Sequence, residues 1–514
     1  MGMPWHVLPE GVGNGHRWGR LPGALGLLAF LASLASIVRG GDFGVPRLVV
    51  FASVSAFSLA CVAALWLTRR LGGGTHRVFL VLYLCLGAFS LVAIPPFATP
   101  DSYQQFCRAY EVSRGGFVSE IDHVDALAGG GSRGFGLLDA GLLVDGRSSG
   151  ALTFDDVATH IGQQVDDGHA EAYEYSAMSL YSPVSFLPSA MGIFVARLFT
   201  RSLWVIVYAA RASTLVFAGT LLYLSIRALP SCKDVIAGIS LSPMLVELYA
   251  SMSPDVVVYG GAVALFSYVL WLRHEGGREK VRLALLLPLM LLVALTKVVY
   301  LPICAFVLLI PGSCFGREER HLWWKLALVL GSVLLNVLWL RSATGYLIEY
   351  NQGVDAHAQL LLVFSQPLGY LLTVLRTILV SGGAWVLGAF GQQLNWLDVE
   401  APTLLPLAFF VLVLTMLFKR GGQRRLIVTT AERVLVASIA LIVCGLIFTS
   451  LYLQWTPVGY ARVLGIQGRY FLPVLPLVAL AVASQKEEES FGWEATAILF
   501  LDLLILMGPL EAAL

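Results

Sequence analysis

The chain alternates between long apolar runs and short polar segments along most of its length. Runs of roughly 15–22 apolar residues fit membrane spans, because about 20 helical residues rise about 30 Å, the thickness of the bilayer hydrocarbon. The shorter runs need flanking polar side chains that reach the headgroups. The pattern predicts about thirteen spans, at residues 22–38, 47–67, 77–95, 205–226, 235–250, 256–272, 283–296, 299–313, 324–341, 403–418, 434–450, 470–484 and 494–511.

Basic residues predict the orientation of these spans. Cytoplasmic loops of membrane proteins are enriched in Lys and Arg, and four basic segments fall on one side if the spans alternate. These segments are "RRLGGGTHR" (69–77), "RHEGGREKVR" (273–282), "GREERHLWWK" (316–325) and "KRGGQRR" (419–425). We therefore expect a cytoplasmic N-terminus, and outward-facing loops around 97–180, 251–255, 343–402 and 451–469.

Two apolar segments disturb this alternation, 181–199 and 367–390. If either one crossed the membrane, the basic loops after it would lie on the wrong side until the other restored the order. We therefore expect both to be interfacial or re-entrant helices at the outer face, in the headgroup plane. The outer loop at 97–180 carries thirteen Asp and Glu against four Lys and Arg, as suits an outer loop.

Composition supports an all-α polytopic membrane protein. The chain is 57% hydrophobic and 13% charged, with a mean hydropathy of +0.77, which a soluble core cannot use. The seven cysteines predict no disulfide framework, and the polar stretch 1–20 before the first run favours a retained anchor over a signal peptide. We expect an N-terminal region (1–75) with two extra spans, a main module (76–485) and a last span (486–514).

No nucleotide-binding or nucleic-acid-binding motif is visible in the chain. "GGGSRGFG" (129–136) looks like a phosphate-binding loop, but it lacks a preceding strand, a following helix and the Gly-Lys-Ser/Thr ending. We interpret it as a flexible linker. His123, His160 and His169 of the outer loop do not stand at ligand spacing on one helix face, so no metal ligands are predicted.

Ionisable and polar residues converge at the predicted outer ends of the spans. An ionisable residue at or inside a span is costly and by default indicates a functional pathway. Carboxylates and cations at one membrane face suit a site for a lipid-linked phosphate, in which cations bind the phosphate and a carboxylate activates a hydroxyl. The candidates are Asp101, Tyr181, Arg211, Asp255, Lys297, Tyr300, Gln467, Arg469 and Tyr470.

Several of these residues also have a structural interpretation. Asp101 and Asp255 could be N-caps of the helices that follow them. Lys297 could be an interfacial side chain that reaches toward water, and Arg469 a headgroup anchor. Arg211, about two turns inside its span, could form a structural pair with Glu247.

The order of these motifs carries a resemblance. Pro-Asp after the third span, "YSPVSFLP" (181–188), "SMSPD" (251–255), "TKVVYLP" (296–302) and "GIQGRYFLP" (465–473) resemble the motifs of a bacterial membrane-protein family, domain of unknown function 2142, over about residues 80–485. That family is similar to the GT-C superfamily of membrane glycosyltransferases, such as the aminoarabinose and protein mannosyl transferases.

The resemblance implies roles for individual residues. Asp101 would be the catalytic base and Asp255 a second acid, while Lys297 and Arg469 would bind phosphate or pyrophosphate. Tyr181 and Pro183 would belong to a juxtamembrane helix. The chain departs from the family pattern after Asp101, since Ser102 and Gln105 stand where Glu and His are usual. That departure leaves the requirement for a divalent cation open.

The expected function is an integral glycosyltransferase of the bacterial plasma membrane. It would move a sugar from a polyprenyl-phosphate donor to a glycan, lipid or protein of the cell envelope. Two alternatives stay open at this point. One is a transporter or flippase of lipid-linked glycan, and the other is a non-catalytic GT-C-like assembly subunit.

Overall fold

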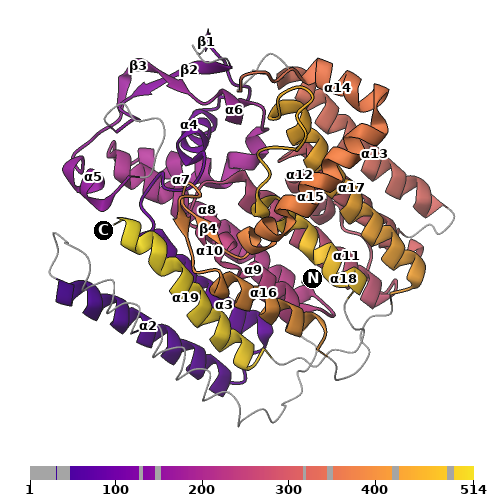
Figure 1. The fold of residues 1–514 in the computed structure, drawn as a ribbon. Helices are drawn as coiled ribbons and strands as arrows, with labels where there is room; N and C mark the ends of the chain where they lie inside the picture. The colour runs from indigo at the N-terminus through magenta and orange to yellow at the C-terminus, as the bar shows by residue number, and fades with distance from the viewer. Residues whose placement is uncertain are drawn as a thin grey trace.

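The computed structural model describes residues 31, 47–126, 131–144, 152–315, 320–343, 351–419, 428–482 and 491–513 (Figure 1). The predicted span at 22–38 lies outside the described residues apart from Leu31. So does most of the basic segment 419–425. The described chain is mostly helical, as expected from its apolar runs.

Eight helices are long and apolar enough to cross a membrane. The expected count of thirteen is therefore not confirmed, since the other apolar segments form helices of 17 residues or fewer in the described part of the chain. The eight are α2 (Arg47–Arg70), α3 (Thr75–Ala93), α8 (Leu203–Ala228), α11 (Pro254–Glu275), α13 (His321–Ala343), α15 (Pro367–Ala389), α17 (Thr430–Gln454) and α19 (Trp493–Ala513).

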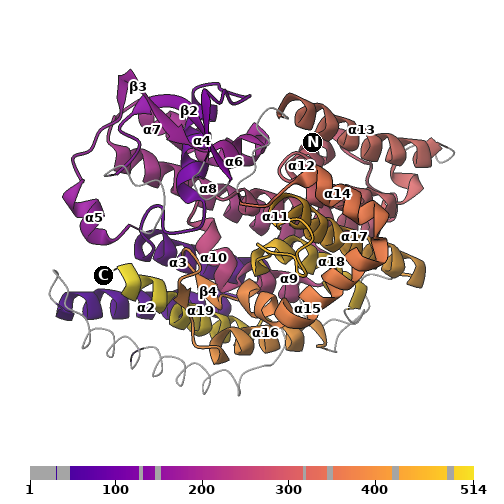
Figure 2. The ribbon, with the colours of Figure 1, turned by 45° about the horizontal axis from the view of Figure 1, so that its top comes forward.

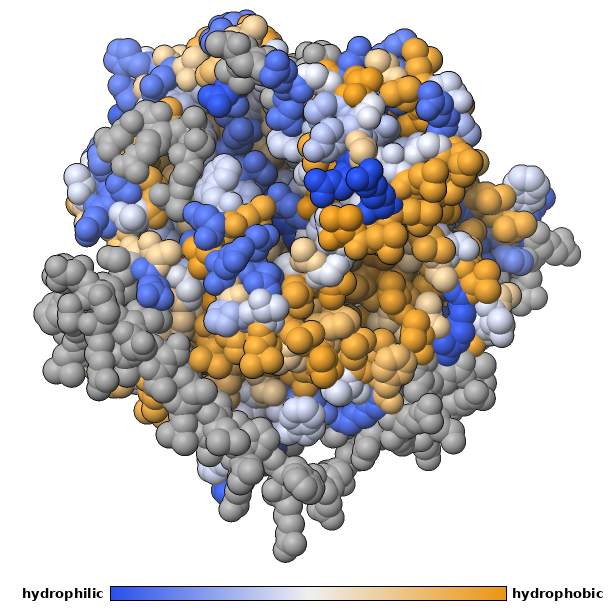
Figure 3. Space-filling model, in the orientation of Figure 1, coloured by the Kyte–Doolittle hydropathy of each residue, from blue (hydrophilic) through white to orange (hydrophobic). Residues whose placement is uncertain are grey.

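Helix α11 lies at the centre of this bundle. In its most apolar window 94% of the residues are buried, against 17% in α13 and 11% in α15. A peripheral helix that exposes Leu, Val and Ile along its length requires an apolar solvent, which the bilayer supplies. Figure 3 shows such hydrophobic side chains over α15, α16 (Leu404–Leu417) and α18 (Leu475–Val482), and hydrophilic ones over the small β-sheet.

The predicted span at 235–250 is wrong as a continuous helix. The structure has two short helices there, α9 (Lys233–Ser240) and α10 (Pro243–Tyr249). Pro243 begins the second one, where its missing N–H costs no hydrogen bond. The Ser240 carbonyl, freed by the interruption, accepts a hydrogen bond of 2.9 Å from the Tyr249 hydroxyl. Every residue of both helices is buried, which is where a broken helix is tolerated in a membrane protein.

Four other predicted spans are also shorter than expected, and one of them, 403–418, forms α16. The segments at 283–296 and 299–313 form α12 (Leu283–Ala294) and the 3₁₀ helix η2 (Val298–Leu309). The segment at 470–484 begins as the 3₁₀ helix η6 (Gly468–Val474) and continues as α18. Pro302 and Pro473 lie inside the two 3₁₀ helices, where the missing N–H prevents regular α-helical bonding.

The two segments that we expect to be interfacial differ from the long membrane-spanning helices, one in its length and the other in its packing. Residues 181–199 contain only η1 (Pro183–Phe186) and α7 (Leu187–Arg197), which is short for a span. Helix α15 is long enough to cross, but both its ends contact the last turns of α17. The Tyr370 hydroxyl lies 2.7 Å from Thr449 Oγ1, and the Trp385 ring packs on Phe448. Tyr370 and Trp385 are fifteen residues apart, which is about 22 Å along the helix axis. Because both contact the same end of α17, α15 runs across that end. The interfacial position of α15 stays a prediction.

The predicted outer loop is a folded unit, which we call the loop domain (residues 97–200). It contains α4 (Ser102–Ser113), α5 (Phe154–Thr159), α6 (Ser176–Ser179), η1 and α7 around an antiparallel sheet of order β1-β2-β3 (Figures 1 and 2). The strands are β1 (His123–Ala126), β2 (Ser132–Ala140) and β3 (Asp166–Glu174). The prediction of a flexible linker at 129–136 is therefore wrong from Ser132 onward, where β2 begins. Gly134 pairs with Val124 of β1, and Gly136 pairs with Tyr173 of β3.

Polar contacts bring the basic segments to one end of the helical bundle, which we call the basic end. Arg273 Nη1 lies 2.6 Å from Glu432 Oε1, and Lys419 Nζ lies 3.0 Å from Glu494 Oε1. These pairs join the end of α11 to the start of α17, and the end of α16 to the start of α19. Thr75 Oγ1, at the start of α3, donates to Asp234 Oδ1 at the start of α9 (2.6 Å). Since α3 begins there and α11 ends there, the far ends of both helices lie at the opposite end.

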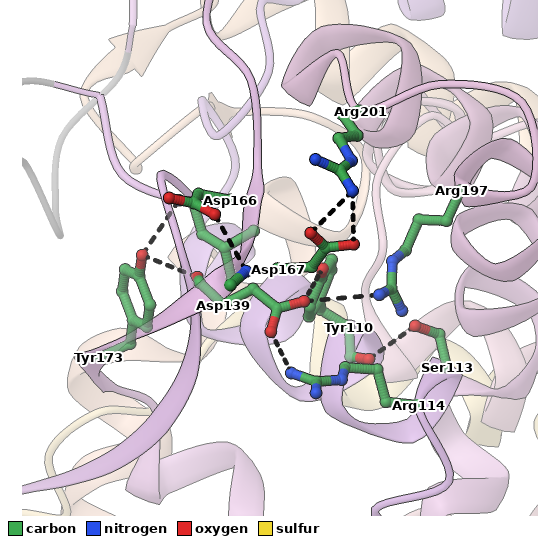
Figure 4. Close-up of polar contacts among 11 residues, drawn as sticks. Tyr110, Ser113, Arg114, Asp139, Asp166, Asp167, Tyr173, Arg197 and Arg201 are labelled. Atoms are coloured by element: carbon green, nitrogen blue, oxygen red, sulfur yellow. Dashed lines mark hydrogen bonds and ion pairs between the residues drawn. The ribbon is translucent and has the colours of Figure 1, made fainter.

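Within the loop domain, a buried carboxylate fastens the β-sheet to α4 and α7 (Figure 4). Asp139 of β2 accepts a hydrogen bond of 2.6 Å from the Tyr110 hydroxyl and forms ion pairs with Arg114 and, at 3.4 Å, with Arg197. The Arg197 guanidinium also lies over the Tyr110 ring, 4.8 Å from its centre. These contacts join three elements of the loop domain, including the helix that begins directly after Asp101.

We predict that Asp139→Asn loosens the loop domain. The substitution leaves two arginines without their buried counter-charge, and we expect a loss of about 1–3 kcal/mol. Hydrogen–deuterium exchange should then rise in β2 and β3. The control is Asp167→Asn, because Asp167 and its partner Arg201 are both exposed, with side-chain exposures of 47% and 64%. Equal exchange in the two variants would contradict a positioning role for Asp139.

Candidate functional site

Four charged side chains meet at the end of the bundle opposite the basic end: Asp101, Asp255, Lys297 and Arg469. We call them the quartet. They come from the starts of α4 and α11, the junction of α12 and η2, and the start of η6. Helix α11 packs against both η2 and η6, which brings together segments far apart in the sequence. The structure thus places the four principal candidates in one cluster, while their catalytic and binding roles stay predictions.

Asp101 has a left-handed backbone conformation, with φ at +60°. Aspartate adopts this region more readily than most residues, although it is costly for any residue other than glycine. Asp101 occupies the N-cap position of α4, but its side chain makes no capping hydrogen bond. The interpretation of Asp101 as an N-cap is therefore confirmed for its position, although its side chain does not cap the helix. Its Oδ2 instead lies 3.6 Å from Arg469 Nη2.

Asp255, by contrast, is not the N-cap of its helix, so that interpretation is wrong. Ser253 occupies that position, and its hydroxyl accepts a hydrogen bond from the Asp255 N–H (3.2 Å). The Asp255 carboxylate lies in the first turn of α11, where the helix dipole favours negative charge. Its Oδ1 lies 2.5 Å from Lys297 Nζ, and its Oδ2 lies 3.6 Å from Arg469 Nε. Asp255 therefore has two cations as neighbours.

The two cations point inward, and neither is a membrane anchor. The Lys297 side chain is 14% exposed and donates to Asp255, so the interpretation as an outward-reaching lysine is wrong. The Arg469 side chain is 5% exposed and lies between the two carboxylates, so it is not a headgroup anchor. Gly468 allows this position, because a Cβ there would collide with the Trp385 carbonyl of α15.

Arg469 has hydrogen-bonding capacity to spare. A guanidinium carries five N–H donors, yet both carboxylates stand at 3.6 Å, beyond a good hydrogen bond. Its Nε is buried without a hydrogen-bond partner among the described residues. A buried donor left unpaired is costly, so a ligand oxygen that accepted from Arg469 would be favoured.

Three tyrosines complete the surroundings of the quartet. Lys297 Nζ lies 5.5 Å from the centre of the Tyr181 ring and 5.4 Å from that of Tyr470, both within cation–π range. The Tyr300 hydroxyl donates to the Tyr470 carbonyl (2.8 Å) and so holds the start of η6. Burial raises the pKa of Tyr181 above its ordinary value, an effect that the positive charge of Lys297 opposes.

The remaining polar residues near the quartet shape its backbone. The side chains of Ser102 and Gln105 donate to the carbonyls of Thr99 (2.5 Å) and Pro100 (3.3 Å), in the turn that leads into Asp101. Gln467 is the residue before η6, and its side-chain oxygen is buried without a partner among the described residues. The two residues that depart from the family pattern therefore stabilise the turn.

Arg211 makes no contact with the quartet among the described residues, so the structure does not bring it into this cluster, and its role in the site stays a prediction. It donates to the carbonyls of Ile94 (2.8 Å) and Ala250 (2.5 Å), the C-caps of α3 and α10. A cation at helix C-termini is favourable, because the last carbonyls lack partners. The suggested ion pair between Arg211 and Glu247 does not form among the described residues. Arg211 donates to the two carbonyls, and Glu247 accepts from the Asn395 N–H (2.7 Å).

A further buried carboxylate, Glu247, lies in α10, shortly before the quartet member Asp255 in the sequence. The sequence analysis considered it only as a structural partner of Arg211. No group of three or more His, Cys, Asp or Glu is arranged to hold a metal in the part of the chain that the structure describes. His123 stacks on Phe135, 4.9 Å between ring centres, and His169 pairs with Asp166 (2.7 Å).

Comparison with known proteins gives one match. A family model described as "Predicted membrane protein (DUF2142)" matches residues 84–478. This region includes the whole quartet, the whole loop domain and the central helix α11. No curated protein matches the chain, and no solved structure does.

We predict that Lys297→Met destabilises the protein, because it removes the closest partner of a buried carboxylate. Breaking a buried pair is strongly destabilising, and with Arg469 still present we expect a loss of about 2–4 kcal/mol. Thermal unfolding in detergent measures it. The double variant Lys297→Met/Asp255→Asn should recover much of the loss, while the exposed Lys280→Met should have little effect. A double variant as unstable as the sum of both single variants would contradict direct pairing.

Proposed function

The chain belongs to this family of predicted membrane proteins, and we propose that it is a glycosyltransferase with a polyprenyl-phosphate sugar as donor. The observation that carries the proposal is the quartet itself, two carboxylates on either side of a buried arginine with a lysine behind them. The acceptor is a hydroxyl of a cell-envelope glycan, lipid or protein. Likeness to the GT-C superfamily is part of this proposal, since the order of acids and cations along the chain supports it.

Arg469 and Lys297 are the proposed phosphate-binding residues. The unpaired donor of Arg469 supports this, because guanidinium N–H groups match phosphate oxygens in pairs. Lys297 is bound more tightly to Asp255, at 2.5 Å, and acts mainly by its charge. Both cations are largely buried. A buried cation stabilises negative charge more strongly than an exposed one, because less water screens it.

Asp101 is the proposed general base. Its side chain is 43% exposed, against 6% for Asp255, so an acceptor from solution reaches it more easily. In the reaction the acceptor oxygen bonds to the anomeric carbon and gives its proton to Asp101. The bond from that carbon to the phosphate oxygen breaks, and the lipid phosphate leaves with the electron pair. Arg469 and Lys297 stabilise the charge that develops on it.

The proposed location of the quartet is the outer face of the bacterial plasma membrane. The basic end, joined by Arg273, Lys419 and their partners, lies opposite the quartet, and basic segments favour the cytoplasm. The loop domain lies on the side of the quartet, because α4 follows Asp101 directly. A polyprenyl-linked donor suits this face, which has no nucleotide supply.

A non-catalytic assembly subunit is the second candidate. Ser102 and Gln105 replace the usual Glu and His, and both are engaged in the turn. A flippase would use the same cations for the phosphate. The two alternatives differ from the enzyme in giving no covalent product, so a product assay separates them.

We predict that Asp101→Asn abolishes transfer while the protein still folds and inserts. The amide cannot accept the proton of the acceptor hydroxyl, and loss of a general base typically lowers rates about 10²–10⁴-fold. Mass spectrometry of cell-envelope glycans, with wild type and variant in a deletion strain, measures the product. Asp125→Asn, an exposed change of the same charge on β1, serves as the control. Rescue of the deletion strain by Asp101→Asn would instead favour the assembly subunit.

We also predict that the two ends face opposite sides of the membrane. In a variant without native cysteines, Asp125→Cys on β1 should react with a membrane-impermeant maleimide in intact spheroplasts. Arg278→Cys, in the basic segment after α11, should react only after permeabilisation. The reverse pattern would place the quartet on the cytoplasmic side and remove the argument for a donor used at the outer face.

A further inference from the structure

We propose that Asp101 occupies the place of the donor phosphate at Arg469, and that the donor enters by displacing it. This inference rests on the proposed function, because it assumes that Arg469 binds a lipid phosphate. It adds a binding order, in which the donor binds first and thereby releases the base. It also makes Asp101 an internal competitor of the substrate.

The geometry distinguishes the two carboxylates beside Arg469. Asp255 is held by Lys297 at 2.5 Å and by its helix start, and its side chain is 6% exposed. Asp101 has Arg469 as the only charged partner of its side chain among the described residues, at 3.6 Å. Its side chain is 43% exposed and makes no capping hydrogen bond. Of the two, Asp101 is therefore the one that can leave at little cost, since water can solvate it.

The hydrogen bonding of Arg469 favours the exchange. Neither carboxylate stands within good hydrogen-bonding distance, and Nε is buried and unpaired. Asp101 faces Arg469 Nη2 at 3.6 Å, so a phosphate oxygen in its place could accept a hydrogen bond from that N–H at a shorter distance. Asp101 therefore gives up only a long contact when it leaves Arg469, and the ligand can form a shorter one.

The charges of the quartet also favour exchange over simple addition. Two carboxylates and two cations balance one another, so an added phosphate would leave the buried cluster with net negative charge. Uncompensated charge in a dry site is costly. When Asp101 moves into water, one positive charge remains, and a phosphodiester with a single negative charge restores the balance.

The exchange makes the reactive state dependent on the donor. While Asp101 is paired with Arg469, its carboxylate is directed at the guanidinium and is not free to contact an acceptor hydroxyl. When the donor phosphate takes Arg469, Asp101 is free to face the acceptor. If an acceptor or a water molecule binds before the donor, Asp101 is still paired with Arg469 and does not accept a proton from that molecule.

The test is equilibrium binding of a polyprenyl phosphodiester, which carries one negative charge like the donor, to the full-length protein in detergent, with uncharged polyprenol as a second probe. We expect Asp101→Asn to bind the phosphate more tightly than wild type by roughly 3- to 10-fold, as for loss of a partly exposed ionic competitor. Asp125→Asn should leave the affinity unchanged. Polyprenol should bind wild type and Asp101→Asn equally. Arg469→Ala should bind the phosphate more weakly, and a thermal melt of each variant checks its folding.

The outcomes separate this inference from the proposed function. Unchanged or weaker phosphate binding by Asp101→Asn, with weaker binding by Arg469→Ala, overturns the exchange and leaves Arg469 as the phosphate site. If Asp101→Asn binds polyprenol as well as the phosphate more tightly than wild type, the exchange is also overturned, because the gain in affinity would then not depend on the charge of the phosphate. Unchanged phosphate binding by folded Arg469→Ala overturns the phosphate site itself.

Discussion

The pairing of Asp255 with both Lys297 and Arg469 holds together three segments that the chain places far apart. Asp255 begins the central helix, Lys297 lies between α12 and η2, and Arg469 lies at the start of η6. None of the three can be withdrawn from water alone without a large cost. Because each is buried, the pairing fixes how η2 and η6 sit against α11. The position of Arg469, and with it the fourth member Asp101, depends on that arrangement.

Irregular backbone accompanies these charges throughout the structure. The 3₁₀ helices η2 and η6 both begin at the quartet, and the break between α9 and α10 lies within the buried core. Such segments leave backbone groups without regular helical partners, so a membrane protein can have them only where other groups satisfy them. The Tyr249 hydroxyl does this for Ser240, and Arg211 does it for Ile94 and Ala250. Arg211 thus has a structural role in these contacts, and its role in the site stays a prediction.

The fold of the loop domain could not be predicted from the polarity of its sequence alone. Its acidic composition predicts an exposed segment on one side of the membrane, and the glycines of 129–136 resemble a linker. The sheet depends instead on pairing of β2 with its chain neighbour β1 and with β3, which lies much further along the sequence. Asp139, unremarkable in the sequence, becomes buried and joins two arginines and a tyrosine (Figure 4). Its partners come from α4 and α7, so no local pattern predicts them.

The sequence by itself determined that the chain is a helical membrane protein and where most of its long helices lie. It also determined which charged residues stand at helix ends, because a charge is too costly in the hydrocarbon unless paired. Asp101, Asp255, Lys297 and Arg469 could be selected on that ground. Only the tertiary structure decided which acid meets which cation. The distances between separate helices set those pairs, and the length and polarity of a segment do not encode such distances.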